Sequence, residues 1–198
     1  APVGTQADVA TRIITDSREA KAGDVFVALV GEQFDGHDYV ADVLAKGVAA
    51  VIVSREVVAG DARQIMVADT LAALGQIAQA WRLKWNPKIV ALTGSNGKTT
   101  VKEMCAAILR EAVGEDAVLA TAGNFNNEIG MPLTLLRLQA VHKVAVLEMG
   151  MNHFGELARL TQIAKPDVAL VNNASRAHIG NDFNGVADIA RAKSEIYA

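Results

Sequence analysis

Short apolar runs alternate with amphipathic segments along the whole chain. A continuous run of apolar and β-branched residues predicts a strand covered on both faces, and apolar positions at helical spacing predict a helix. In the first part of the chain, these patterns predict strands at 25–30, 48–54 and 65–67, a short helix capped by Asp38 and ended by Gly47, and a long helix from Asp69 to Trp85. Asn86-Pro87 should end the long helix, because a residue before proline avoids helical geometry.

The second part of the chain repeats a strand–turn–helix pattern. It predicts strands at 89–93, 118–121, 144–148 and 168–172, and helices at 98–113, 132–138, 156–164 and 186–197. The helix over 98–113 would bury one apolar stripe, formed by Val101, Met104, Cys105, Ile108, Leu109 and Val113. This alternation indicates an α/β fold with parallel strands and helices on both faces. We place the domain boundary at 85–88, which gives a small domain over 1–85 and a larger one over 86–198.

Composition and charge restrict the class of protein. The 198 residues include 19 Lys and Arg and 22 Asp and Glu, and this net charge of −3 disfavours a protein that coats nucleic acid or an anionic membrane. The apolar runs are far shorter than the ~20 residues that a membrane-spanning helix needs. The N-terminal sequence APVGTQADVA lacks the pattern of a secretory signal. A single cysteine, Cys105, excludes an internal disulfide and suits the reducing cytoplasm, where we expect the protein.

A glycine-rich segment, GSNGKTT, lies between a predicted strand and a predicted helix. Glycines let backbone N–H groups surround an anion, and the following helix points its positive end at the same place. Lys98 would add charge for the β- and γ-phosphates, and the Thr99 hydroxyl suits Mg²⁺. The residues expected to bind nucleotide are Gly94, Ser95, Asn96, Gly97, Lys98, Thr99 and Thr100. The string is a shortened phosphate loop, because Leu92 stands where the general pattern has glycine, and a turn with an exposed lysine is the alternative.

Several segments together resemble the Mur ligase family, the ATP-dependent enzymes that build the peptide of bacterial peptidoglycan. They are GSNGKTT, Glu148 within LEMGMNHFGE, NNASRAHIG at 172–180 and ARAKSEIY at 190–197. Within the family, GNFNNEIGMPLTLL at 123–136 is similar to the ligases that add D-alanyl-D-alanine to UDP-N-acetylmuramoyl tripeptide. The segments TDSR, AGDVFVALVG and DGH before residue 38 are similar to the uridine-nucleotide domain of those ligases.

The resemblance implies a small uridine-nucleotide domain followed by an ATP-binding domain, and a reaction through an acyl phosphate. It also implies ATP, two Mg²⁺ ions and small-molecule substrates, in a protein that we expect to be monomeric. Family members are much longer, so we expect this sequence to be an N-terminal portion that lacks the C-terminal domain and is inactive alone. Two alternatives are another ligase of the family with a different amine acceptor, and a module that binds the UDP substrate without catalysis.

Four residues are expected to be catalytic: Lys98, Glu148, His178 and Lys193. The roles of Lys98 and Glu148 also follow from the needs of phosphoryl transfer. Lys98 should neutralise the phosphates, and Glu148 should hold Mg²⁺ together with Thr99, because it ends a strand on the side of the phosphate loop. A carboxylate solvated at the sheet edge is the alternative for Glu148. The resemblance makes His178 a ligand of the second Mg²⁺, and a hydrogen-bonded loop histidine is the alternative.

Lys193 matches the family lysine that CO₂ converts to a carbamate. A carbamate is an anion with two oxygens and could orient the second Mg²⁺, and its formation needs a neutral amine, which burial near positive charge favours. The alternative is a solvated lysine paired with Glu195 or Asp188.

The expected substrate contacts lie in two loops. Asn124, Asn126 and Asn127 should bind the muramoyl peptide or its phosphates, because amides give and accept hydrogen bonds without adding charge. A turn that uses the backbone preferences of asparagine is the alternative. Ser17 and Arg18 should bind the UDP end, since a guanidinium suits pyrophosphate oxygens, and a plain surface turn is the alternative.

Overall fold

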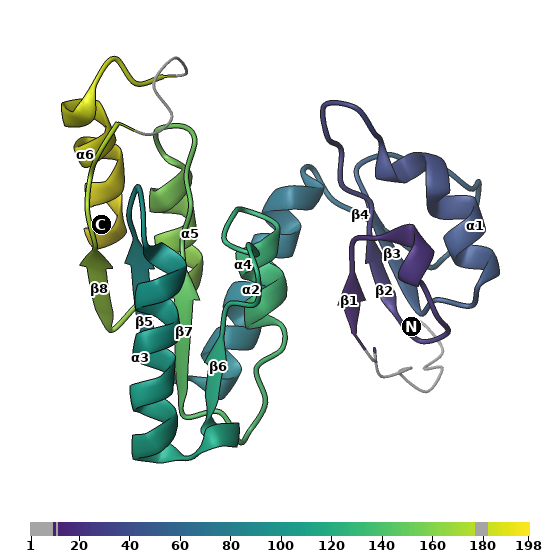
Figure 1. Cartoon of the computed structure of the whole chain (residues 1–198). Coiled ribbons are helices and arrows are strands. Elements are labelled where there is room, and N and C mark those ends of the chain that lie inside the picture. Colours follow the sequence, from purple (N-terminus) through teal and green to yellow (C-terminus); the bar gives the residue numbers. More distant parts are fainter. Residues whose placement is uncertain (1–9, 11, 177–181) are drawn as a thin grey trace. The chain divides into compact units, whose positions relative to one another are not determined.

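The chain folds into two compact α/β units, Ala1–Leu74 and Gly75–Ala198 (Figure 1). The structure is a computed structural model and describes residues 10, 12–176 and 182–198. The boundary between the units falls within helix α2 (Thr70–Trp85). Among the described residues, none of the helices has both the length and the apolar character needed to cross a membrane.

The first unit is a four-stranded parallel sheet with the order β1-β2-β3-β4. Its elements are β1 (Ile13–Ile14), η1 (Ser17–Glu19), β2 (Val25–Val27), η2 (Gly36–Tyr39), α1 (Val40–Ala45), β3 (Ala50–Val53) and β4 (Gln64–Met66). Phe26 and Val51 lie side by side in register and are buried with the α1 residues Val40 and Val43. The core of this unit therefore forms between the two central strands and α1.

Turn chemistry in the first unit agrees with the sequence except at one cap. Gly47 adopts a left-handed conformation (φ 80°), and Asp69 accepts hydrogen bonds from Leu71 N and Ala72 N, as predicted. The prediction that Asp38 caps the short helix is wrong. The chain enters α1 through the 3₁₀ turn η2, so the cap is needed earlier, and Asp35 Oδ1 accepts from His37 N at 2.9 Å.

The second unit is also a four-stranded parallel sheet, with the order β6-β7-β5-β8. Its strands are β5 (Lys88–Thr93), β6 (Val118–Ala120), β7 (Val144–Glu148) and β8 (Val168–Val171). Its helices after α2 are α3 (Lys98–Val113), η3 (Glu115–Ala117), α4 (Gly130–Leu135), α5 (Glu156–Ala164), α6 (Val186–Ser194) and η4 (Glu195–Tyr197). The predictions of parallel strands and of α3, β7 and α5 are confirmed.

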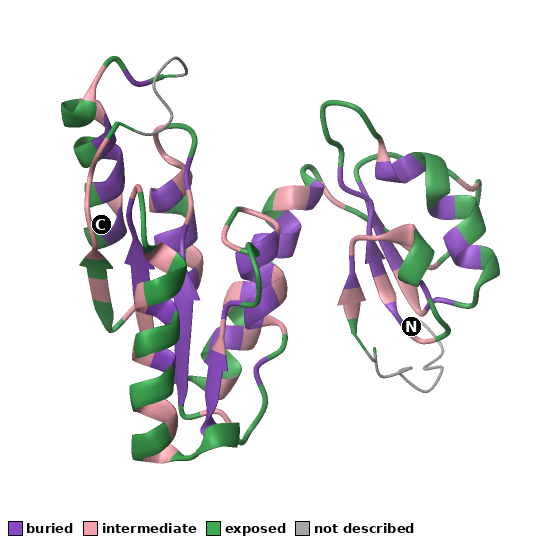
Figure 2. Cartoon of the chain, viewed as in Figure 1, coloured by how far each residue is buried: buried purple, intermediate pink, exposed green. Residues whose placement is uncertain are grey.

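Both faces of the central strands are covered, and Figure 2 shows β7 buried along its length. Leu92 of β5 packs with Ala106 of α3 and Val146 of β7 on one face. On the other face, Ile89 and Ala91 of β5 join a larger cluster with residues of α2, α4, α5 and α6. Successive side chains of a strand point to opposite faces, so β5 supplies both clusters. The ends of β5 and β7 are thereby held rigidly at one edge of the sheet.

The predicted stripe on α3 is wrong in part. Met104 and Ile108 are 60% and 68% exposed, whereas Lys102 is 1% exposed. The helix lies over the sheet on the face that contains Val101, Cys105 and Leu109, and Lys102 flanks that face. A lysine stem can be buried where the amine finds acceptors, and here it does.

Candidate nucleotide and metal site

The turn at 94–97 joins β5 directly to α3. Gly97 precedes the helix in a left-handed conformation (φ 72°, ψ 8°), which glycine adopts without the steric cost of a Cβ. The first N–H groups of α3, at Lys98–Thr100, have no acceptor within the helix, so they point toward the space over the turn. This is the geometry of an anion site at a helix N-terminus.

Residues after β8 hold this turn in place. Asn173 Oδ1 accepts from Ser95 N and Asn96 N at 3.1 and 3.0 Å, and the Asn172 and Asn173 amides both donate to Asn96 O. Ser175 N donates to Ser95 Oγ at 2.9 Å. The sequence analysis did not give these residues a role. Their position in the sequence could have indicated a role in the site, because polar residues directly after β8 lie at the same sheet edge as the turn.

Two lysines contribute positive charge at this edge. Lys98 Nζ donates to Gly94 O at 2.9 Å, so its ammonium lies back over the turn. Lys193 of α6 is 1% exposed, and burial together with the charge of Lys98 lowers its pKa to about 8. Among the described residues, no carboxylate pairs with either lysine. The Lys98 ammonium attracts a polyanion such as a triphosphate, while the lowered pKa of Lys193 favours its neutral amine.

The predicted alternative partners of Lys193 are engaged elsewhere. Glu195 accepts hydrogen bonds from Gly155 N and Ala158 N, at the start of α5. Asp188 accepts from Asn184 N and pairs with Arg191. A solvated, paired Lys193 is therefore wrong, and the lysine is buried without either partner.

Thr99, Glu148 and Asn126 meet at the end of β7. Thr99 Oγ1 donates to Glu148 Oε2 at 2.9 Å, and Asn126 Nδ2 donates to Glu148 Oε1 at 2.8 Å. Glu148 is 2% exposed, so the alternative of a solvated carboxylate is wrong. Gly150 permits this approach, since a Cβ there would lie 2.9 Å from Asn126 Oδ1. The sheet edge therefore presents a hydroxyl and a carboxylate beside the phosphate turn.

This pair of oxygens fits a magnesium ion bound together with phosphate. Mg²⁺ takes oxygen ligands, commonly one or two from protein with phosphate and water completing the shell. Within 10, 12–176 and 182–198, no group of three or more His, Cys, Asp and Glu side chains could hold a metal on its own. His178, the predicted ligand of a second ion, lies outside the described residues.

Two further buried residues, which the sequence analysis did not single out, support Glu148. Thr121 Oγ1 accepts from Glu148 N at 3.0 Å, and Lys102 Nζ donates to Thr121 O at 2.7 Å. Both side chains are at most 2% exposed. Lys102 follows Thr99 by three residues and so lies on the same side of α3. That spacing is the sequence signal that could have drawn attention to Lys102.

The three predicted asparagines occupy different positions. Asn126 contacts Glu148, as described above. Asn127 Oδ1 accepts from Ile129 N and Gly130 N, so its side chain forms the turn that begins α4. Asn124 is exposed, and its carbonyl accepts from Asn126 N at 2.7 Å. The turn alternative thus describes Asn127, while Asn126 faces the candidate site.

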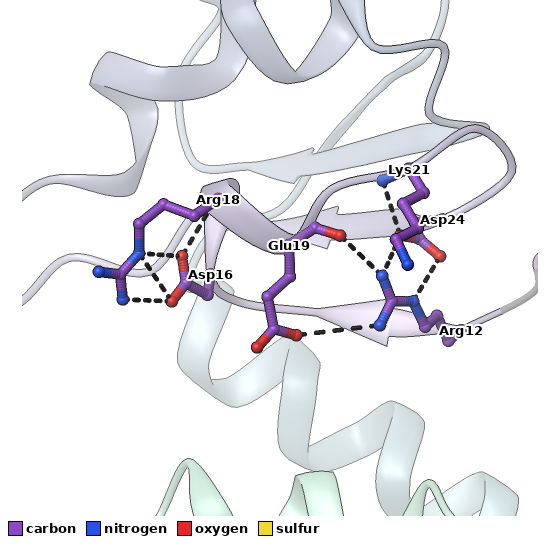
Figure 3. Close-up of polar contacts among 6 residues, drawn as sticks. All are labelled: Arg12, Asp16, Arg18, Glu19, Lys21 and Asp24. Atoms are coloured by element: carbon purple, nitrogen blue, oxygen red, sulfur yellow. Dashed lines mark hydrogen bonds and ion pairs between the residues drawn. The ribbon is translucent and has the colours of Figure 1, made fainter.

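The predicted UDP contacts, Ser17 and Arg18, lie in the first unit, and Figure 3 shows Arg18. Arg18 is 87% exposed and makes three side-chain hydrogen bonds to the Asp16 carboxylate, which hold the pKa of Asp16 at about 2. Ser17 O accepts from Lys46 Nζ at 2.8 Å. Both residues belong to η1, on the surface of the unit. Arg18 could reach a ligand, but its charge is already paired.

Models of the Mur ligase family match most of the chain. The model described as "Mur ligase middle domain" matches residues 92–198, and the one described as "Mur ligase family, catalytic domain" matches 10–82. UDP-N-acetylmuramoyl-tripeptide--D-alanyl-D-alanine ligases of Haemophilus influenzae and Escherichia coli are each 46% identical over 94% of this chain. The chain spans 41% and 40% of those two relatives.

Solved structures agree with the sequence matches. MurF from Acinetobacter baumannii superposes with a TM-score of 0.89 at 46% identity, over 95% of this chain and 41% of that one. MurF ligase from Thermotoga maritima, solved in complex with ADP, superposes with a TM-score of 0.87 at 34% identity, over 97% and 44%. This chain, with its two parallel-sheet units and its phosphate turn, belongs to the Mur ligase family.

Proposed function

We propose that the protein to which this chain belongs joins D-alanyl-D-alanine to UDP-N-acetylmuramoyl tripeptide at the expense of ATP. The similarity to ligases of that name supports the proposal, since it extends over 94% of the chain. The observation that carries it is the convergence of Thr99, Glu148 and Asn126 beside the phosphate turn, because it links the ATP end of the site to the GNFNNEIG loop.

The first chemical step joins two anions, so the chain must offset their repulsion. Transfer of the γ-phosphoryl group to the tripeptide carboxylate gives an acyl phosphate and ADP. Lys98 and the N–H groups at the start of α3 would bind the phosphates and stabilise the charge that develops on them. Thr99 and Glu148 would hold Mg²⁺, which when bound would supply positive charge that stabilises the phosphates.

The second step is attack by an amine on the acyl phosphate. The nitrogen lone pair of D-alanyl-D-alanine forms a bond to the acyl carbon, the nitrogen loses a proton to solvent, and inorganic phosphate leaves with the electrons of the carbon–oxygen bond. Asn126 would orient the acyl end, since its amide is fixed by Glu148. Asn124 and Asn127, from the same loop, are proposed as further contacts of the muramoyl peptide.

Lys193 is proposed to carry a carbamate and, with His178, to orient a second Mg²⁺. The neutral amine attacks the carbon of CO₂, a carbon–nitrogen bond forms, and a proton leaves to solvent. Burial and the lowered pKa of Lys193 support this reaction, because they favour the neutral amine. Loss of a labelled carbamate signal in Lys193→Met, after incubation with isotope-labelled bicarbonate, would support it, and an unchanged signal would contradict it.

The domain assignment follows the same proposal. Residues 1–85 would bind the UDP substrate, with Ser17 and Arg18 near its pyrophosphate, and residues 86–198 would bind ATP. The substrates are small molecules, and we propose that the protein is a monomer that acts in the cytoplasm. A chain that binds the UDP substrate without catalysis is the second candidate, since this sequence spans about two fifths of its relatives.

The proposal is tested by a ligation assay on the complete natural protein that contains this chain. We expect ADP and phosphate release that requires Mg²⁺, UDP-N-acetylmuramoyl tripeptide and D-alanyl-D-alanine together. Release with a shorter peptide precursor in preference to the tripeptide would assign another acceptor and contradict the proposal. Calorimetric titration of the 198-residue chain with the UDP substrate and with Mg-ATP tests the second candidate, which predicts binding of the first ligand only.

A further inference from the structure

Lys102 is a buried cation whose contacts lead to the candidate site. Its side chain is 1% exposed, and its ammonium donates to Thr121 O at 2.7 Å and lies 2.7 Å from Glu103 Oε1. Glu103 is 57% exposed, and hydrogen bonding from Lys102 lowers the pKa of Glu103. An apolar residue would bury the same stem at no cost in charge desolvation. The hydrogen bond from the ammonium to Thr121 O therefore indicates why a charged residue stands at this position.

Thr121 stands at the point where β6 ends and the loop with the three asparagines begins. Its N–H donates to Val146 O at 3.0 Å, which ties it to β7. Its hydroxyl accepts from Glu148 N at 3.0 Å, which ties it to the residue that presents the carboxylate. With its carbonyl held by Lys102, Thr121 is fixed through three separate groups.

Two residues of α3 thus fix the carboxylate and the backbone N–H of Glu148. Thr99 contacts its carboxylate directly, and Lys102, one turn later, acts on its backbone N–H through Thr121. Asn126, only five residues after Thr121, contacts the other carboxylate oxygen. A shift of Thr121 would move the loop that carries Asn126 and release the N–H of Glu148 together.

We propose that Lys102 is a positioning residue for the Glu148 carboxylate and the Asn126 loop, acting through Thr121. The inference rests on the proposed function, in which Glu148 holds Mg²⁺ and Asn126 orients the acyl group. Lys102 does not touch substrate or metal in this account. Its role is to keep the end of β7 and the loop after β6 in one geometry, and loss of a partner of this kind typically changes metal affinity or activity by about 10- to 100-fold.

The test compares Lys102→Met, Thr121→Val and their combination in the complete natural protein. Lys102→Met keeps the length of the stem and removes the ammonium, and Thr121→Val removes the hydroxyl but keeps the carbonyl. We expect each to raise the Mg²⁺ concentration for half-maximal ligation by about 10- to 100-fold. The combined variant should be no worse than Lys102→Met, because both changes act through Thr121. Lys143→Met, at an exposed lysine, is the matched control and should change nothing.

Amide hydrogen exchange gives a second measurement that does not depend on activity. In Lys102→Met without ligands, exchange should become faster at Glu148 and in 121–127, and stay unchanged at the β2 and β3 strands of the first unit. An unaltered Mg²⁺ requirement in a folded Lys102→Met protein would overturn the inference, as would faster exchange throughout the second unit with no change in that requirement.

Two other outcomes are also decisive. If Lys102→Met does not fold, Thr121→Val must raise the Mg²⁺ requirement by itself, and failure to do so overturns the inference. If the unsubstituted protein shows no Mg²⁺- and ATP-dependent ligation, the proposed function fails. The exchange measurement then still decides whether Lys102 fixes the loop.

Discussion

Arginines of the first unit are paired with carboxylates, whereas the lysines at the phosphate turn of the second unit are not, within the part of the chain that the structure describes. In the first unit, arginines lie against carboxylates, in the pairs Arg12–Asp24, Arg18–Asp16, Arg55–Asp35 and Arg63–Asp61 (Figure 3 shows the first two). At the phosphate turn of the second unit, Lys98 contacts a carbonyl, and Lys193 is buried without a carboxylate among the described residues. The first arrangement satisfies its own charges, whereas the second leaves the Lys98 ammonium for an anionic ligand and the Lys193 amine without a described carboxylate partner.

The difference shows how to separate structural charges from functional ones. A paired arginine lowers the pKa of Asp16 and of Asp61 to about 2, and the hydrogen bond from His37 N together with Arg55 does the same for Asp35. Burial, together with the charge of the neighbouring Lys98, lowers the pKa of Lys193, which has no carboxylate partner among the described residues. The repulsion by Lys98 is relieved when an anion binds, so unpaired cations at a sheet edge mark a site.

The largest expected effect is that of Lys98→Ala. Removal of the cation beside the phosphates should lower the ligation rate constant of the complete protein by about 10²- to 10³-fold, as loss of a fixed group that stabilises developing charge does. Lys143→Ala, at an exposed lysine of the same unit, should keep the full rate. Steady-state ADP release measures the rate of both variants. A Lys98→Ala protein as active as the unsubstituted protein would contradict the functional role given to the Lys98 charge.

A smaller effect is expected from the titration of Lys193. The pKa is about 8 in the folded state against 10.5 for an unperturbed lysine, so between these values the unfolded chain holds a proton that the folded chain lacks. The free energy of unfolding should therefore rise with pH across this window, by at most about 3 kcal/mol. Urea unfolding between pH 7 and pH 11 in CO₂-free buffer measures it.

Two variants control the titration of Lys193. Lys193→Met should abolish its share of the rise, and Lys143→Met should retain it. If Lys193→Met and the unsubstituted protein gained the same stability over this pH range, Lys193 would not carry the buried charge assigned to it.

Asp24→Asn should lower the free energy of unfolding of the first unit by about 2 kcal/mol. Asp24 is 1% exposed and accepts two hydrogen bonds from the Arg12 guanidinium, and loss of a charged acceptor costs about 1.5–3 kcal/mol. The half-exposed arginine limits the cost, because water can replace its partner. Hydrogen exchange of β2 and β3 measures the change, while exchange of β5 and β7 should be unaffected. Equal effects in both units would contradict the separation between them.

Arg18→Ala should have the smallest effect. The side chain is exposed and already paired with Asp16, so binding of UDP-N-acetylmuramoyl tripeptide should weaken by about twofold to fivefold, the range of an exposed ion pair. The melting temperature should not change. Calorimetric titration measures the binding, and an unaltered dissociation constant would show that η1 is a plain surface turn.

The sequence predicted several local elements and the phosphate turn, although the strand expected at 25–30 ends at Val27 and the helix expected at 132–138 spans Gly130–Leu135. The helix over 98–113 and the strand over 144–148 have the bounds expected from apolar runs, glycines and a charged strand end. These features depend on neighbours within a few residues, where steric and hydrogen-bonding preferences act directly. The predicted cap at Asp38 is wrong because a 3₁₀ turn precedes the helix. Asp35 caps that turn by accepting a hydrogen bond from His37 N.

Burial and long-range partners could not be predicted in this way. Met104 and Ile108 were expected in the core and are exposed, while Lys102 is buried because Thr121, directly after β6, supplies an acceptor. In each case the outcome depends on which distant groups the sheet brings near, and periodicity along one helix contains no information on that.

The sequence alone therefore determined the α/β class, the parallel strands and the GSNGKTT turn, because short-range geometry and apolar patterning specify them. Only the tertiary structure brought Thr99, Asn126 and Glu148 within hydrogen-bonding distance and buried Lys193 and Lys102. The physical reason is that strand order in a parallel sheet places ends of distant segments at one edge. The charge and solvation of a side chain are then set by those neighbours and not by its own place in the sequence.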